Sequence, residues 1–140
     1  MAFSFDHIYA YEVTHKEPAQ VFQKVPDHLK ASYQWINVGV ETDPASSLNP
    51  LKMLLKSFNE DDFISVKLDT DSTSVEIPLA HQLLNDTALH ALVDQFYFEH
   101  HVKLKEVAGN WGRTMQGSVQ DSLELFIGLR EAGVAAHSWV

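Results

Sequence analysis

Short apolar runs alternate with helical patterns along almost the whole chain. Five runs rich in aromatic and β-branched residues predict strands, and they cover residues 6–13, 33–41, 63–68, 95–102 and 134–140. Strands that alternate with helices indicate right-handed βαβ units. We therefore expect an α/β, Rossmann-like domain spanning residues 1–140, with a mainly parallel five-stranded sheet, helices on both of its faces and the run at 63–68 as its central strand.

Start signals support several of the predicted helices. Asn49 followed by Pro50 supplies an N-cap and a proline in the first helical position. Ser74 is the expected N-cap of the helix after the third strand. Ser118 and Asp121 form an S-x-x-D cap before the clearest helical pattern, residues 118–132. Its predicted apolar face consists of Val119, Leu123, Phe126, Ile127 and Leu129.

Composition and charge narrow the classes of partner. The 140 residues carry 10 basic and 19 acidic side chains, a formal charge of -9, which argues against a nucleic acid or an anionic membrane surface as partner. No apolar run approaches the roughly 18–20 residues that span a bilayer. The absence of cysteine excludes disulfides and is compatible with a reducing compartment. The localisation therefore stays open, including an organelle reached after loss of a targeting segment.

Acidic residues and a histidine follow three of the predicted strands. Glu12 ends the first, Asp69 and Asp71 follow the third, and Glu99 and His101 end the fourth. The carboxyl edge of an open α/β sheet is where ligands bind, so these side chains indicate a polar pocket or a hard metal ion. Alternatively, the acids solvate loops and cap helices, which the sequence favours. We expect no metal ion, because no compact ligand spacing such as H-x-x-x-H is present.

Two further features have alternative interpretations. His100 and His101 are adjacent on a predicted strand, so their side chains point to opposite faces and do not easily share a ligand. One of them is then a core histidine, and we expect no catalytic residue. Trp111 and Arg113 lie in a glycine-rich loop that is either a partner-binding tip or a connection pinned by a buried tryptophan.

The strand ends together are similar to a known family. The segments Tyr9–Glu12, Trp35–Val40, Val66–Asp69 and Glu99–His101 occur in an order that resembles the later part of FkbM-type S-adenosylmethionine-dependent methyltransferases and related uncharacterised algal and plant proteins. The resemblance implies that Glu12 holds the cofactor ribose and that Asp69 and Asp71 also contribute to cofactor binding. Glu99 and His101 would then position a substrate.

The chain also departs from the family pattern. Ser72 stands where the family has a glycine, and the glycine-rich turn that should precede Asp6 is missing, which implies a truncated methyltransferase-like topology. We therefore expect a non-catalytic accessory or binding subunit without a cofactor, associated with other protein subunits in a larger assembly. The alternative is an S-adenosylmethionine-dependent O-methyltransferase whose cofactor-binding segment lies outside this chain. A metal-dependent hydrolase-like protein ranks last.

Overall fold

A computed structural model describes residues 4–103 and 115–139 of the chain. It divides into two compact units, one ending at Glu41 and the other beginning at Thr42. Helices alternate with parallel strands in both, so the predicted α/β class is confirmed. Within the described residues, no helix has the length and apolar character needed to cross a bilayer. The expectation of a single domain stays a prediction.

The amino-terminal unit is a two-stranded parallel ladder with short helical segments in its crossover. Its elements are β1 (Ile8–Tyr11), α1 (Pro18–Lys24), the 3-10 helix η1 (Asp27–Leu29) and β2 (Tyr33–Ile36). Ile8 pairs with Tyr33 and Tyr11 with Ile36. Both strands are shorter than predicted, because the Asn37 amide donates to the Glu12 and Thr14 carbonyls at 2.7 and 2.8 Å and replaces the next rungs of the ladder.

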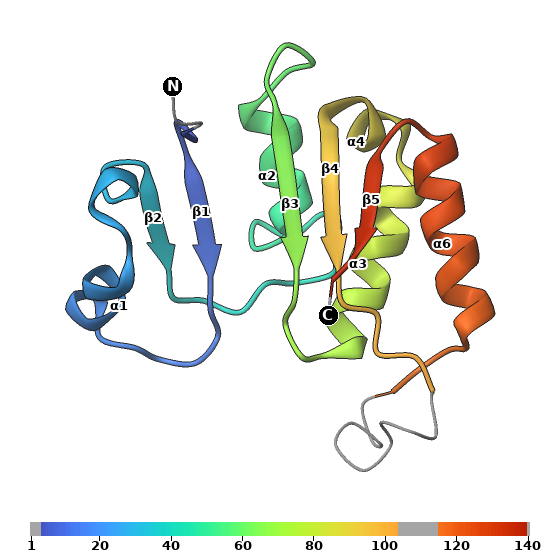
Figure 1. The fold of residues 1–140 in the computed structure, drawn as a ribbon, viewed down its shortest axis with the longest axis horizontal. Helices are drawn as coiled ribbons and strands as arrows, with labels where there is room; N and C mark the ends of the chain where they lie inside the picture. The colour runs from blue at the N-terminus through green and yellow to red at the C-terminus, as the bar shows by residue number, and fades with distance from the viewer. Residues whose placement is uncertain (1–3, 104–114, 140) are drawn as a thin grey trace. The chain divides into compact units, whose positions relative to one another are not determined.

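The carboxyl-terminal unit contains a three-stranded parallel sheet in the order β3-β4-β5 (Figure 1). Its elements are α2 (Pro50–Ser57), β3 (Ile64–Leu68), α3 (Thr73–Asn85), α4 (Thr87–Leu92), β4 (Val93–Phe98), α6 (Val119–Glu131) and β5 (Ala135–Ser138). The prediction of one five-stranded sheet is wrong, because the strands pair in a set of two and a set of three. Within the second set, β4 is central and β3 lies at the edge.

In this unit, the helices form one layer on one face of the sheet. Consecutive strands are neighbours, so two right-handed crossovers place α3, α4 and α6 on the same side. α3 contacts both α4 and α6, and α2 contacts α4. The core lies between this layer and the sheet, around Phe96 and Phe98, which are 1% and 0% exposed. The arrangement in this unit therefore differs from the predicted covering of both faces.

The opposite face of the same sheet is polar and aromatic. The Lys67 ammonium lies 4.3 Å from the centroid of the Trp139 ring, and Tyr97 stacks on His137 at 4.9 Å. Lys67 also forms an ion pair with Asp69 at 2.7 Å. Successive residues of β3 and β4 thus point alternately to the apolar face, which packs against the helices, and to the polar and aromatic face.

The predicted N-cap residues precede their helices in the structure, with one exception. The Asn49 side chain accepts a hydrogen bond from the Lys52 amide at 3.0 Å, and Ser118 and Asp121 form a reciprocal capping box. Gly133, with φ of +97°, follows the end of α6 in the left-handed region that favours glycine. Ser74 is the exception: α3 already begins at Thr73, which places Ser74 inside the helix.

The two serines provide a matched pair of substitutions. Ser118→Ala removes the hydroxyl that accepts the Asp121 amide, so we expect a loss of about 1 kcal/mol in the free energy of unfolding. Ser74→Ala removes a hydroxyl that caps no helix and should cost less than half as much. Urea denaturation of both variants measures the difference. Equal losses would contradict the assigned helix starts.

Candidate functional site

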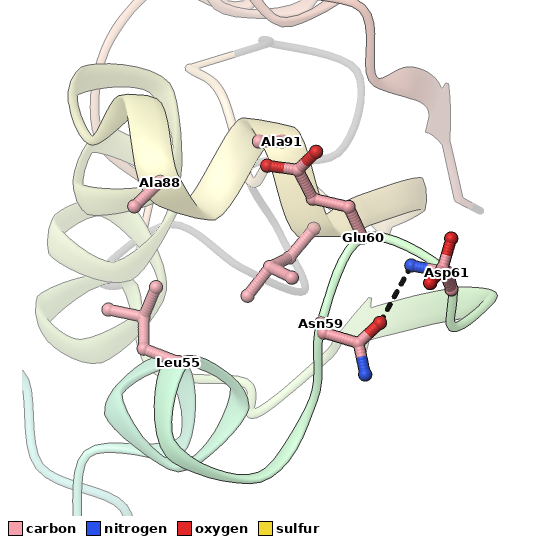
Figure 2. A pocket seen from close by; sticks show the side chains of 7 residues that line it. Leu55, Asn59, Glu60, Asp61, Ala88 and Ala91 are labelled. Carbon is pink, nitrogen blue, oxygen red and sulfur yellow. Dashed lines mark hydrogen bonds between the residues drawn. The ribbon is translucent and has the colours of Figure 1, made fainter.

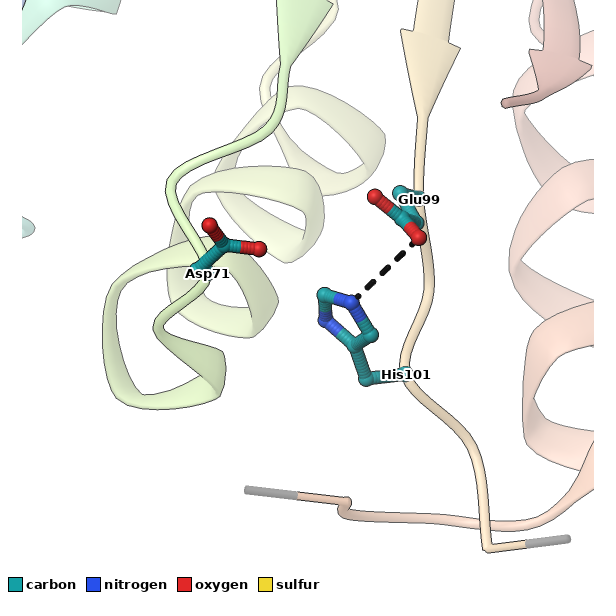
Figure 3. A group of neighbouring side chains, drawn as sticks. All are labelled: Asp71, Glu99 and His101. Atoms are coloured by element: carbon teal, nitrogen blue, oxygen red, sulfur yellow. Dashed lines mark ion pairs between the residues drawn. The ribbon is translucent and has the colours of Figure 1, made fainter. Parts of the chain in front are cut away.

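The structure brings three of the predicted site residues together at the carboxyl ends of β3 and β4. Asp71 follows β3, while Glu99 and His101 follow β4, and each offers a ligand atom within 4.8 Å of the other two (Figure 3). Their proximity follows from the pairing of Leu68 with Phe98, the last residues of two parallel strands. We call these three residues the acid–histidine cluster.

His101 is the buried member of the cluster. Its side chain is 4% exposed, and its Nε2 lies 3.5 Å from Glu99 Oε1. On the other side of the ring, Nδ1 lies 3.5 Å from Oε2 of Glu76, a residue of α3 with 0% exposure. The imidazole therefore lies between two carboxylates, one of them fully removed from water.

Glu76 is the functional residue that the sequence interpretation missed. Glu76 was expected in the first turn of a helix, where it is found. Beyond that, its Oε1 accepts the Thr70 amide hydrogen at 2.7 Å, which ties α3 to the turn after β3. A signal was present: Glu76, Leu79 and Leu83 have the i, i+3, i+7 spacing of one helix face, and all three are buried.

The two adjacent histidines differ for a reason other than the predicted one. β4 ends at Phe98, so both lie beyond the strand and the expected strand alternation does not apply. His100 stacks on the Phe98 ring at 5.1 Å and 18°. Burial lowers the pKa of His100, and the charges of His81 and His101 add to this effect, while Asp121 opposes it. His100 is only half-buried, and neither of its ring nitrogens has a hydrogen-bond partner in the described part of the chain, so it is not the predicted core histidine; His101 is the buried one and belongs to the cluster.

Asp71 supplies the exposed side of the cluster. Its φ of 54° lies in the left-handed region, which aspartate and asparagine enter more readily than other residues with a side chain. It follows the point where the chain leaves β3 and precedes α3. The turn places its carboxyl group opposite Glu99 and His101 (Figure 3).

The other two predicted cofactor-binding acids have partners of their own. Asp69 pairs with Lys67 on the polar face of the sheet. Glu12 accepts from Lys16 Nζ at 2.7 Å and from the Thr14 amide at 2.8 Å. The hydrogen bond from Lys16 lowers the pKa of Glu12, with a further contribution from Thr14. Trp111 and Arg113, the predicted partner-binding residues, lie outside the described residues.

A shallow depression of about 500 Å³ lies near the amino ends of the strands of the same sheet (Figure 2). Its lining comes from the end of α2, the turn before β3 and α4: Leu55, Asn59, Glu60, Asp61, Ala88, Ala91 and Leu92. The turn is held by a hydrogen bond of 2.9 Å from the Asp61 amide to Asn59 Oδ1. Because this depression adjoins the amino end of β3, it is separate from the acid–histidine cluster at the carboxyl end.

The cap of α6 predicts a pH dependence with a definite sign. Hydrogen bonds from Ser118 lower the pKa of Asp121, so its stabilising contribution is present above its unfolded pKa of about 3.9 and is lost as the pH falls through the lower folded value. We expect Asp121→Asn to lower the melting temperature at neutral pH, by an amount that shrinks below about pH 4. Thermal melts across this range test it, with Glu131→Gln as control. A constant difference would contradict it.

The fold and the cluster together define the class: an α/β protein with parallel strands and a polar acid–histidine cluster at a carboxyl sheet edge. Comparison with protein-family models, with curated proteins and with solved structures finds no match for this chain.

Proposed function

We propose that this chain is a non-catalytic, methyltransferase-like binding subunit that works with other proteins in a larger assembly. The observation that carries the proposal is an apolar stripe on α6. Val119, Leu123 and Ile127 are 46%, 52% and 50% exposed, and their i, i+4, i+8 spacing aligns them along the helix. The sequence predicted all three on the buried face, whereas the structure buries Leu125, Phe126 and Leu129.

The surroundings of the stripe indicate the chemistry of its partner. Glu124 and Glu131, three residues before and four after Ile127, are exposed beside the stripe together with one basic residue, Arg130, and the whole chain carries a formal charge of -9. An apolar stripe with an acidic margin suits an amphipathic helix of another protein whose own apolar face is bordered by lysine or arginine. The proposed partner is therefore a basic, helix-presenting protein subunit.

Two of the three predicted cofactor-binding acids are paired with lysines, which supports a non-catalytic role. Glu12 and Asp69 both form ion pairs with lysines close to them in sequence, Lys16 and Lys67. The sequence also has no G-x-G turn at a strand-to-helix junction, the type of turn at which a dinucleotide-like cofactor approaches the backbone. Calorimetric titration with S-adenosylmethionine separates this proposal from the alternative, an O-methyltransferase completed by a segment outside this chain. Micromolar binding would support the alternative.

Affinity purification of the tagged full chain from its native cells tests the partner surface. We expect a basic protein to be recovered in stoichiometric amount with the native sequence and to be lost with Leu123→Glu. Val13→Glu is the matched control, because Val13 is 75% exposed and lies outside α6, and it should retain the partner. Recovery of the same protein with both variants, or of a second copy of this chain alone, would contradict the proposal.

A further inference from the structure

We propose that Asp71, Glu99 and His101 bind a divalent first-row transition-metal ion, with Glu76 as the carboxylate that orients the histidine. This site goes beyond the proposed function, because partner binding through α6 requires no metal. The argument has three parts: the spacing of the donor atoms, the buried carboxylate behind His101 and the excess of negative charge.

The spacing suits a metal ion with short bonds. His101 Nε2 and Glu99 Oε1 are 3.5 Å apart. Two donors bound at about 2.0–2.2 Å in a tetrahedral arrangement lie about 3.4 Å from each other. The donor atoms of all three residues lie within 4.8 Å of one another, so a shift of about one ångström by the exposed Asp71 completes the set.

Glu76 is an independent observation that points to a ligand. It is 0% exposed, and in the described part of the chain its Oε2 accepts no hydrogen bond while facing His101 Nδ1 at 3.5 Å. Metal-binding histidines usually donate the hydrogen of their second nitrogen to a carboxylate or carbonyl, which fixes the tautomer and the ring orientation. Here Glu76 occupies that position behind the ring, and Nε2 points toward Glu99.

The excess of negative charge around His101 also supports a metal site. The carboxylates of Glu76, Glu99 and Asp71 surround a single imidazole. Among the described residues, His101 has one ring nitrogen 3.5 Å from an oxygen of each glutamate, Nδ1 near Glu76 and Nε2 near Glu99. Buried or half-buried carboxylates are costly without compensation, and a divalent cation supplies it for the cluster.

The donor set selects the class of ion. One imidazole nitrogen with two carboxylate oxygens suits Zn²⁺, Mn²⁺ or Fe²⁺, whereas Mg²⁺ and Ca²⁺ prefer oxygen ligands alone. Of these three ions, Zn²⁺ is expected to bind most tightly by the usual order of affinities. Three protein ligands leave a further position for water or another ligand, which distinguishes this site from a closed structural zinc site.

Calorimetric titration of the chelator-treated full chain with Zn²⁺ and with Mg²⁺ tests the site. We expect one equivalent of Zn²⁺ to bind at micromolar affinity or tighter, and Mg²⁺ to bind at least about a hundredfold more weakly. Asp71→Asn keeps a residue that tolerates the left-handed turn, and it should weaken Zn²⁺ binding at least about tenfold, as should Glu99→Gln. Asp69→Asn, a neighbouring acid outside the cluster, should leave the affinity unchanged.

Glu76→Gln tests the orienting role separately. We expect it to weaken Zn²⁺ binding about 10–100-fold and to alter the visible absorption bands of the Co²⁺-substituted protein, which report the geometry around the ion. Circular dichroism checks that each variant is folded, and the exposed Asp71 keeps the test valid if changes at buried Glu76 unfold the chain. Millimolar binding, or micromolar binding that Asp71→Asn and Glu99→Gln leave unchanged, would overturn the proposal.

Discussion

Replacing Phe98 with alanine is expected to lower the free energy of unfolding by about 3–5 kcal/mol. Phe98 is 0% exposed at the end of the central strand of its sheet, with ring contacts to Phe96, Phe126 and His100. The substitution leaves a cavity between the sheet and α6, because the surrounding rings fill it only in part. Equilibrium unfolding in urea measures the loss.

Phe63 provides the control for this substitution. It is 51% exposed just before β3, so Phe63→Ala should cost about 1 kcal/mol or less. A loss for Phe98→Ala that is no larger than the loss for Phe63→Ala would contradict the assignment of the core to the space between the helix layer and the β3-β4-β5 sheet.

The second large effect is expected from Glu76→Ala, which should lower the free energy of unfolding by about 2–4 kcal/mol. The substitution leaves the Thr70 amide without its acceptor and removes the carboxylate that faces His101. Glu131→Ala is the control, because Glu131 is exposed on α6 and should change stability by about 0.5 kcal/mol or less. Denaturant unfolding in the presence of a chelator gives both values without a contribution from metal.

Glu76→Gln refines this second prediction. The amide oxygen retains an acceptor for the Thr70 amide, so its cost should be smaller than that of Glu76→Ala. If both substitutions at Glu76 were as mild as Glu131→Ala, the buried carboxylate would have no structural role. The link between α3 and the turn after β3 would then need another explanation.

The parts of the fold that local signals determine could be predicted from the sequence. Asn49 with Pro50, and Ser118 with Asp121, identified two helix starts because capping depends on residues three positions apart. Strand ends and strand partners were harder. Asn37 ends the first ladder through hydrogen bonds to residues more than twenty positions away, which no local pattern indicates.

The candidate site was predictable in part for the same reason. Asp71, Glu99 and His101 were expected at one sheet edge, because the carboxyl ends of neighbouring parallel strands meet there. Glu76 was missed because its role depends on how α3 packs behind that edge, although its position on an apolar helix face was visible. The exposed stripe on α6 was missed because periodicity identifies apolar positions but does not show which of them the core can accommodate.

The central claim, that α6 presents a docking surface for another protein, is tested most directly by photo-crosslinking. A photoreactive amino acid replaces Leu123 in the full chain in its native cells, and the same amino acid replaces Phe63, another half-exposed apolar residue outside α6, in a control. The account predicts one discrete product with a basic protein from position 123 and none from position 63. No product from position 123, or the same product from both, would contradict it.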